Sequence, residues 1–128
     1  MDIIANMFTK IKNAQAVGKE TVVVDYSKLK KNILDVLLKN KFIKEVSHKG
    51  KKDKKIIEIT LLYDEKGNGR ISGIERISKL SRRIYTPFKK IKSLSRGRLL
   101  ILSTPKGVLW GDEAIKEGVG GEIICRIW

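Results

Sequence analysis

The segment DEKGNGR, Asp64–Arg70, limits what this chain can fold into, because two glycines flank an asparagine among charged residues. Such a cluster is typical of a loop between structural elements. It divides the 128 residues into two halves, which we assign to residues 1–66 and 67–128. A half of roughly 70 residues is marginal as an isolated core, so we expect two small lobes packed on each other.

The first half predicts two amphipathic helices. Asp2 can cap a helix whose apolar residues recur at helical spacing. Ser27 can cap a second helix that runs to Asn40. The apolar residues predicted to be buried are Ile3, Ile4, Met7, Phe8, Ile11 and Ala14 in the first helix and Leu29, Ile33, Val36 and Leu37 in the second.

Strands complete the prediction, and the fold class is α+β. Residues 20–26, 42–47 and 55–63 are β-branched or alternating and give the first lobe the order α-β-α-β-β. The second lobe is predicted to be mostly β, with a short helix. Its elements are short strands near 71–77 and 83–86, a basic helical or irregular segment, a strand at 99–102 that stops at Ser103 and resumes at Val108, a helix at 112–118 and a strand at 122–128.

Charge restricts the function. The chain has 28 Lys and Arg against 14 Asp and Glu, a net charge of +14. Such an excess opposes folding by self-repulsion and favours a polyanionic partner. Between Arg76 and Lys106 there are ten basic residues and no acidic one. Nucleic acid or an anionic membrane could neutralise this surface.

A membrane is the weaker candidate. No apolar run approaches the roughly 20 residues that span a bilayer, and no aromatic-rich amphipathic helix is evident. The N-terminus lacks the features of a secretory signal. One cysteine, Cys125, allows no internal disulfide and suits a reducing compartment. We expect an intracellular protein, cytoplasmic and of bacterial type, with the plastid stroma also compatible with the composition.

The sequence does not favour catalysis. His48 is the only histidine, so no histidine pair can bind a metal, and Cys125 lies in an apolar strand where thiols are usually structural. Asp112, Glu113 and Glu117 fall near a helix, where acids in the first turn favour its dipole. We therefore predict no enzyme, no metal, no cofactor and no small-molecule substrate.

The interrupted strand RLLILSTPKGVLW carries the first group of candidate RNA-binding residues. Aliphatic residues on both sides hold a loop that offers two hydroxyls and a lysine. Hydroxyls and backbone N–H groups can contact phosphates, ribose 2′-OH groups and base edges. The candidates here are Ser103, Thr104, Lys106 and Gly107. The lysine-rich turn Lys49–Lys55 is a weaker candidate for phosphate contact.

A second group surrounds Tyr85, which offers a stacking face directly after two arginines, Arg82 and Arg83. Glu122 is a carboxylate on a basic surface, so it either accepts a hydrogen bond from a base amino group or orients a neighbouring lysine or arginine. Gly120 and Gly121 would let an RNA backbone approach closely.

These residues lie in motifs that resemble the bacterial-type small-subunit ribosomal protein S-eight family. The opening DIIANMFTKIKNA is similar to the common family opening DPIADMLTRIRNA. The other matching stretches, in family order, are SKLKKNIL, ERISKLSRRIY, ILSTPKGV and GGEIICRIW. The resemblance extends over essentially the whole chain.

The resemblance implies two α/β lobes, the second of which binds a helix in the central domain of small-subunit rRNA. It implies early, direct binding during subunit assembly, beside neighbouring small-subunit proteins. Carried over by position, Ser103 and Thr104 occupy the RNA-reading loop, Tyr85 is the family aromatic and Glu122 is the acid of the Gly-Gly-Glu motif. A secondary RNA-facing edge in the first lobe would contain Thr9, Lys12, Asn13, Ser27, Lys28 and Lys30.

Three positions depart from the family pattern. Pro105 replaces the third hydroxyl of the Ser-Thr-Ser loop, and this removes one hydroxyl and one N–H donor. Leu80 and Ser81 replace a Pro-Gly turn before the paired arginines. The glycine-rich approach to the loop strand is SLSRGR here, and we expect Arg96 and Arg98 to compensate electrostatically. The alternative function is a translational repressor that binds a messenger RNA, such as that of its own operon, which mimics the rRNA site.

Overall fold

The computed structural model describes residues 2–50 and 54–128, so the centre of the turn Lys49–Lys55 lies outside the described residues. The chain forms two compact units, Met1–Ile71 and Ser72–Trp128. The first unit includes residues 67–71, which the sequence analysis assigned to the second lobe. Gln15 holds this segment, because its amide donates to the Ile71 carbonyl at 2.9 Å and accepts from the Ile71 N–H at 3.2 Å.

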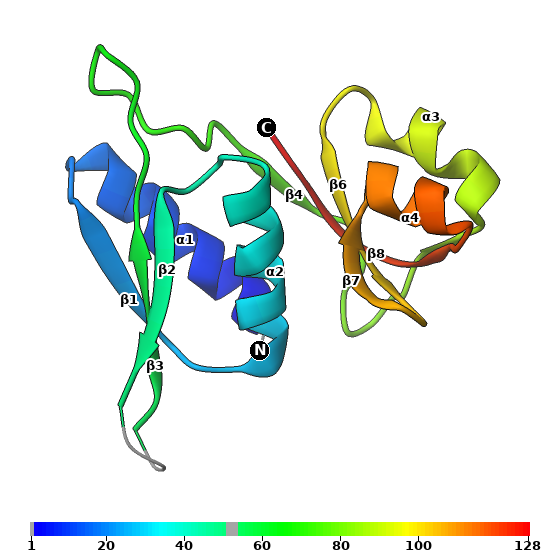
Figure 1. Ribbon diagram of the computed structural model, residues 1–128, viewed down its shortest axis with the longest axis horizontal. Helices are drawn as coiled ribbons and strands as arrows, with labels where there is room; N and C mark the ends of the chain where they lie inside the picture. The colour runs from blue at the N-terminus through cyan, green and yellow to red at the C-terminus, as the bar shows by residue number, and fades with distance from the viewer. Residues whose placement is uncertain (1, 51–53) are drawn as a thin grey trace. The chain divides into compact units, whose positions relative to one another are not determined.

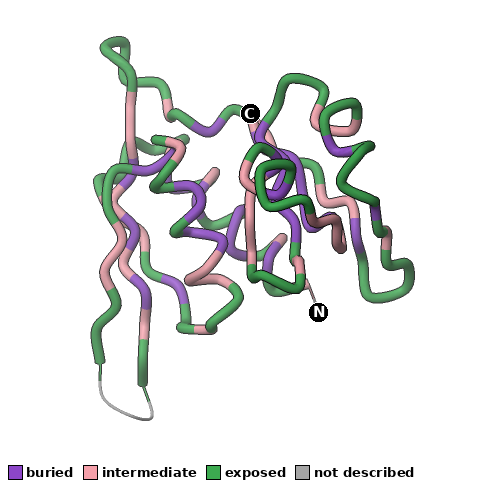
Figure 2. Tube along the Cα trace, turned by 45° about the vertical axis from the view of Figure 1, so that its right-hand side comes forward, coloured by how far each residue is buried: buried purple, intermediate pink, exposed green. Residues whose placement is uncertain are grey.

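The first unit is a three-stranded antiparallel sheet with two helices on one face (Figure 1). Its elements follow the predicted order: α1 (Ile3–Ala16), β1 (Thr21–Asp25), α2 (Lys28–Lys39), β2 (Glu45–Lys49) and β3 (Ile56–Thr60). β3 is the central strand, so β1 lies at an edge of the sheet. Buried stretches run along these helices and strands (Figure 2). The fully buried side chains include Met7, Phe8, Ile33, Leu37, Ile57 and Ile59.

Both predicted helix starts are confirmed. A carboxylate oxygen of Asp2 accepts hydrogen bonds from the N–H groups of Ile4 and Ala5, at 3.1 and 3.0 Å. The Ser27 hydroxyl accepts from the N–H of Lys30 at 3.1 Å. Each cap satisfies N–H groups that have no partner within the helix, so the helices begin where the sequence predicts.

Three predictions for the first unit are wrong. Ile3 and Leu29, expected in the buried stripes, are 42% and 37% exposed. The strand expected at 42–47 begins only at Glu45. Phe42 and Ile43 are buried but precede that strand. Their side chains enter the core where the chain leaves α2, so an apolar pair in a connection was interpreted as part of a strand.

The second unit is a five-stranded antiparallel sheet. Its elements are β4 (Ile74–Arg76), β5 (Tyr85–Thr86), the 3₁₀ turn η1 (Phe88–Lys90), α3 (Ile91–Ser95), β6 (Leu99–Thr104), β7 (Gly107–Trp110), α4 (Gly111–Glu117) and β8 (Gly121–Ile127). β8 pairs with β4 and β5 on one side and with β6 on the other, and β6 pairs with β7. The predicted α+β class is confirmed in both units.

The helices of the second unit lie on one face of its sheet, which we call the helix face. Ile91 of α3 and Ala114 of α4 pack there against Leu100, Leu102 and Ile123. Because side chains alternate along a strand, Leu99, Ile101 and Ser103 belong to the opposite face, which we call the Ser103 face. Among residues 2–50 and 54–128, no helix is long and apolar enough to cross a membrane.

β6 does not end before Ser103 as predicted. Its pairing with β7 continues through Ser103 and Thr104, so only Pro105 and Lys106 separate the two strands. Both of these residues have negative φ, and Gly107 follows with φ 108°. A two-residue turn therefore joins the strands, with Thr104 paired to Gly107 across it. The proline occupies the first central position of the turn, where it is favoured.

The pairing of β6 with β8 shifts by one residue in the middle of the sheet. The residue pairs on either side of the shift are Ile101 with Cys125 and Leu102 with Ile123. Ile124 therefore has no partner in β6, as in a β-bulge. Its carbonyl accepts a hydrogen bond from the N–H of Ile77 at 3.2 Å instead. Cys125, predicted to be structural, is fully buried beside the bulge.

Helices α1, α2 and α4 end in the same backbone motif: a residue with positive φ reverses the chain, and the N–H of the next residue donates back to a carbonyl in the last turn. The residue with positive φ is Gly18 after α1 (φ 72°) and Gly118 after α4 (φ 68°), whereas α2 is followed by Lys41 (φ 60°). At the end of α2, the N–H of Phe42 donates to the carbonyl of Leu37 at 2.9 Å. This bond and the burial of both side chains hold Lys41 in the left-handed conformation.

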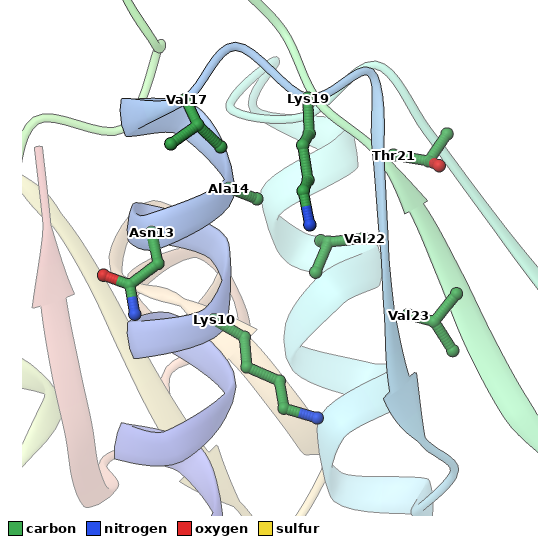
Figure 3. Close-up of a pocket in the computed structure, with 8 residues that line it drawn as sticks. All are labelled: Lys10, Asn13, Ala14, Val17, Lys19, Thr21, Val22 and Val23. Carbon is green, nitrogen blue, oxygen red and sulfur yellow. The ribbon is translucent and has the colours of Figure 1, made fainter.

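A groove of about 650 Å³ opens between the C-terminal half of α1 and β1 (Figure 3). Lys10 and Lys19 extend their ammonium groups into the groove, and Val22 of β1 faces the same space. Asn13 and Val17 also line it.

Candidate nucleic-acid interface

Four residues form a row across the sheet of the second unit. The strand register places Val108 of β7, Ser103 of β6, Glu122 of β8 and Tyr85 of β5 directly opposite one another. Directly opposed residues share a face of the sheet, so all four belong to the Ser103 face. Ser103 is exposed and Tyr85 is 68% exposed. A hydroxyl, a carboxylate and an aromatic ring therefore meet on one surface.

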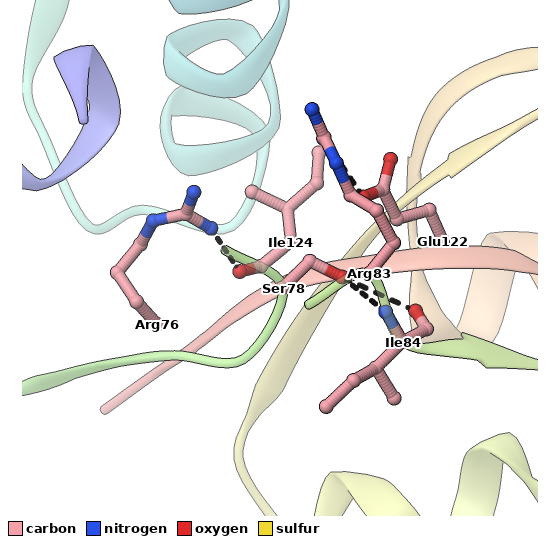
Figure 4. A network of polar contacts seen from close by, with 6 residues as sticks. All are labelled: Arg76, Ser78, Arg83, Ile84, Glu122 and Ile124. Atoms are coloured by element: carbon pink, nitrogen blue, oxygen red, sulfur yellow. Dashed lines mark hydrogen bonds and ion pairs between the residues drawn. The ribbon is translucent and has the colours of Figure 1, made fainter. Parts of the chain in front are cut away.

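Arg83 joins this row through an ion pair. Its guanidinium lies 3.0 Å from the carboxylate of Glu122 (Figure 4), and the arginine side chain remains 51% exposed. The Glu122 side chain is only 18% exposed. Of the two roles considered for Glu122, the structure shows the second, the orientation of a neighbouring arginine. The arginine thus keeps a defined position while much of its surface faces solvent.

A buried serine that the sequence analysis did not select supports this arrangement. The Ser78 hydroxyl accepts from the N–H of Ile84 at 2.9 Å and donates to its carbonyl at 3.2 Å (Figure 4). The Ile84 carbonyl also accepts from the N–H of Ile123 in β8 at 2.9 Å. Ser78 therefore fixes the residue that separates Arg83 from Tyr85. Its sequence signal is a small polar residue directly after Ile77.

Arg76 lies in the same network. Its guanidinium donates to the carbonyl of Ile124, the residue left without a β6 partner by the bulge (Figure 4). The same carbonyl accepts from the N–H of Ile77, so Arg76 adds a second hydrogen bond that ties its side chain to the bulge. The sequence analysis counted Arg76 only as the start of the basic stretch.

The hairpin tip uses its own polar groups. The Thr104 hydroxyl donates to the Gly107 carbonyl at 2.8 Å and accepts from the Lys106 N–H at 3.1 Å. The Lys106 ammonium lies 3.0 Å from a carboxylate oxygen of Glu117 in α4. Thr104 is adjacent to Ser103 in an extended strand, so its side chain points to the helix face. The predicted loop residues are therefore divided between two faces.

Gly120 and Gly121, at the start of β8, lie against neighbouring backbone. A Cβ atom on Gly120 would lie 2.1 Å from the carbonyl oxygen of Thr86, and one on Gly121 would lie 2.1 Å from that of Ser103. The space beside both residues is therefore filled by the backbone of this chain. On the side where a Cβ atom would lie, both glycines permit close approach of neighbouring protein segments; their contact with RNA stays a prediction.

Much of the positive charge of the basic stretch is not neutralised by acidic side chains. Seven residues of the basic stretch form no ion pair with any described residue: Lys79, Arg82, Lys89, Lys90, Lys92, Arg96 and Arg98. Arg98 lies over the ring of Trp128, with its guanidinium carbon 3.8 Å from the ring centroid. Within the described residues, no cluster of three or more His, Cys, Asp and Glu side chains offers a metal site.

The secondary candidates in the first unit form two groups. Thr9, Lys12 and Asn13 lie on α1, where spacings of three and four residues place side chains near each other, although the Thr9 hydroxyl already donates to the Ala5 carbonyl at 2.9 Å. The other group is at the start of α2. It contains the capping residue Ser27, the exposed Lys28 and Lys30, whose ammonium donates to the Asp25 carbonyl at 3.2 Å.

Comparison with known proteins identifies the family. A family model described as ribosomal protein S8 matches residues 2–128. The chain belongs to the ribosomal protein S8 family. Small ribosomal subunit protein uS8 of Nautilia profundicola is 42% identical over 128 residues, and the proteins of the same name from Helicobacter pylori and Helicobacter acinonychis are 38% identical. Each match covers 99% of this chain and 98% of the relative.

Leu80 and Ser81, which replace the Pro-Gly pair of the S8 motif, lie in a turn that this chain still closes. Leu80 and Ser81 are the central residues of a turn in which Lys79 and Arg82 each donate a backbone hydrogen bond to the other, at 2.9 and 3.0 Å. Leu80 is 72% exposed at its tip. The turn therefore closes without the Pro-Gly pair and presents Arg82 beside Arg83.

Proposed function

We propose that the Ser103 face of the second unit binds a helix in the central domain of small-subunit rRNA. As a member of the S8 family, the protein is a structural constituent of the small ribosomal subunit, and rRNA binding is the general role of that family. The observation that carries the proposal is the row of Ser103, Glu122 and Tyr85, extended by Arg83, whose neighbour Arg82 has no acidic partner among the described residues.

Each side chain in the row has a distinct capacity. Arg83, oriented by Glu122, can donate two parallel hydrogen bonds to a phosphate. The exposed ring of Tyr85 can stack on an unpaired base. The Ser103 hydroxyl forms no hydrogen bond with the described residues, so it can bind a base edge or a 2′-OH. This combination can distinguish one RNA structure from another, in addition to attracting the negatively charged phosphates.

The hairpin tip supports binding in a less direct way. Thr104 shapes the turn, and Lys106 has an exposed ion pair with Glu117 that a phosphate can replace at little cost. The basic residues at the Lys79–Arg82 turn and in η1 and α3 add long-range attraction. We assign sequence preference to the Ser103 face and general affinity to these flanking residues.

The same proposal extends to assembly. Direct binding by the second unit would occur early in subunit formation, in the bacterial cytoplasm, and would organise neighbouring small-subunit proteins. The first unit would add a weaker RNA-facing edge through Thr9, Lys12, Asn13, Ser27, Lys28 and Lys30. Because two of these hydroxyls already have protein partners, we expect their lysines and Asn13 to supply most of that contact.

Titration of the full chain against RNA tests the proposal. The probes are a fragment of the central-domain helix and a scrambled duplex of equal length, each measured at several salt concentrations. Arg82→Ala and Arg83→Ala should weaken binding to both RNAs and reduce the salt slope by about 0.7–0.9 per lost phosphate contact. Lys116→Ala, on the exposed side of α4, is the matched control. Unchanged affinity and slope in both arginine variants would contradict the assignment.

A further inference from the structure

Along the outer edge of β1, some peptide groups have no hydrogen-bond partner among the described residues. Two backbone hydrogen bonds mark the ends of the pairing between β1 and β3. The Glu20 carbonyl accepts from the Leu61 N–H at 2.9 Å, and the Tyr26 N–H donates to the Lys55 carbonyl at 3.1 Å. In an antiparallel pair, alternate residues form these bonds. The peptide groups of Val22 and Val24 therefore face β3, and those of Thr21 and Val23 face away from it.

The groove beside α1 lies along this same edge. Thr21, Val22 and Val23 all line it, opposite residues of α1 and the turn that follows (Figure 3). One further outward carbonyl, that of Asp25, accepts from the Lys30 ammonium at 3.2 Å and is already satisfied. The exposed edge is thus confined to the part of β1 that borders the groove.

The groove is positively charged and partly apolar. The ammonium groups of Lys10 and Lys19 point into it (Figure 3), and neither forms an ion pair with a described residue. Val17 is 70% exposed and Val23 is 42% exposed. Unpaired strand edges recruit extended chains by backbone hydrogen bonding, while the two lysines select negative charge.

We propose that the groove binds an extended acidic segment of another protein, which adds to β1 as a fourth strand. The segment pairs its backbone with Thr21 and Val23, its acidic side chains meet Lys10 and Lys19, and an apolar side chain contacts Val17. An RNA strand is the less suitable occupant, because it has no peptide groups to pair with a strand edge and gains little from the valines. This site is separate from the Ser103 face, so either of these two assignments can fail alone. It shares Asn13 with the proposed RNA-facing edge of the first unit, so a bound segment would compete with RNA for that residue.

Amide hydrogen exchange on the full chain, observed by NMR, tests the proposal. The probe is a capped heptapeptide of alternating glutamate and valine. It should slow exchange at the N–H groups of Thr21 and Val23 by about tenfold or more, while Val22 and Val24, already paired with β3, change little. Two control peptides have lysine in place of glutamate or N-methyl groups on alternate amides. Neither control should protect these amides.

Two sets of variants add a second measurement. Lys10→Glu combined with Lys19→Glu should weaken peptide binding by about tenfold or more, whereas Lys116→Glu, with the same change of charge per site in the second unit, should not. Val23→Pro removes an outward N–H and should abolish protection of Thr21 without unfolding the sheet. Val22→Pro removes an inner hydrogen bond and serves as the destabilised comparison.

The outcomes separate the occupants. Protection by the glutamate peptide that is lost in the double variant supports a strand partner. Equal protection by the lysine peptide, or none by either, overturns the proposal. A third outcome would assign the groove to nucleic acid instead. In that case duplex RNA changes the chemical shifts of Lys10 and Lys19, and the glutamate peptide does not protect Thr21 and Val23.

Discussion

Ser103 and Thr104 are adjacent in sequence and lie on opposite faces of β6. Ser103 shares its face with Glu122 and Tyr85, and its hydroxyl has no protein partner among the described residues. The Thr104 hydroxyl closes the hairpin turn through two hydrogen bonds. The two hydroxyls therefore have separable effects, one on RNA recognition and one on stability.

Ser103→Ala should change the free energy of unfolding by less than about 0.5 kcal/mol and weaken binding to the cognate RNA helix by roughly 0.5–1.5 kcal/mol. Binding to a scrambled duplex should barely change, because phosphate contacts determine that affinity. Titration against both RNAs at one salt concentration measures the difference. Equal losses on the two RNAs would mean that Ser103 has no part in recognition.

Thr104→Val should reduce the free energy of unfolding by about 1 kcal/mol, because it removes both hydrogen bonds of the turn at similar side-chain volume. The loss should exceed that of Ser103→Ala in urea denaturation followed by circular dichroism. If Thr104→Val retains full stability but loses RNA affinity, the hydroxyl contacts RNA and its bonds in the turn are dispensable.

The ion pair between Arg83 and Glu122 leads to a prediction with opposite signs on two ligands. Glu122→Gln should weaken binding to the cognate helix, because Arg83 loses the carboxylate that orients it. The same change should slightly strengthen binding to unrelated duplex RNA, because it removes a negative charge. A double-mutant cycle with Arg83→Ala isolates the coupling. Additive effects of the two changes would show that Glu122 does not act through Arg83.

Lys41 follows α2 at the position that glycine occupies after α1 (Gly18) and α4 (Gly118). A left-handed conformation costs a residue with a Cβ atom about 1–2 kcal/mol, and replacing Lys41 by glycine would remove this cost. Part of the stability gained is lost, because glycine has more conformational freedom in the unfolded chain. Lys41→Gly should therefore raise the free energy of unfolding by about 0.5 kcal/mol, while Gly118→Ala should lower it by about 1 kcal/mol. Urea denaturation measures both, and a less stable Lys41→Gly would refute this explanation.

Asp64 should contribute to stability at neutral pH and lose that contribution in acid. The Asp64 carboxylate accepts hydrogen bonds from the N–H groups of Asn68, at 2.9 Å, and Lys66, at 2.8 Å. These bonds, that of Asn68 most of all, hold the pKa of Asp64 below that of an unfolded aspartate. A lowered folded-state pKa stabilises the protein above the unfolded pKa, and the effect disappears as pH falls through the folded value.

Asp64→Asn keeps a side-chain oxygen acceptor and removes the titration. The variant should therefore show a weaker loss of stability below about pH 4 than the parent. Denaturation at a series of pH values measures this, with an NMR titration of the parent carboxyl as a direct check. Identical acid profiles for the two proteins would exclude a contribution from Asp64.

The sequence predicts the fold well where one face of an element is clearly apolar. α1 and α2 combine helical spacing with a capping residue, and their caps lie at Asp2 and Ser27 as expected. The apolar pattern is misleading where a side chain is buried outside a helix or strand. Phe42 is buried by the end of α2, although its apolar neighbour made the segment resemble a strand.

The candidate site is predicted in composition more than in geometry. Strand register brings Ser103, Glu122 and Tyr85 together, and no local pattern encodes that register. Thr104 was grouped with Ser103 because a loop was expected, whereas a continued strand sends the two side chains apart. Long-range contacts such as those of Gly120 with Thr86 also depend on the assembled sheet.

The bulge at Ile124 makes the length of β8 as important as its side chains. Because orientation alternates along a strand, an extra residue that the sheet did not accommodate would reverse every residue on one side of it. The bulge absorbs the extra residue at Ile124: Cys125 still pairs with Ile101, while Glu122 stays on the same face as Ser103 and Ile123 packs with the helices. Deletion of Ile124 would leave these pairs in a regular ladder and would remove the carbonyl that Ile77 and Arg76 bind. An added residue between Glu122 and Ile123 has no such bulge to absorb it and would exchange surface for interior.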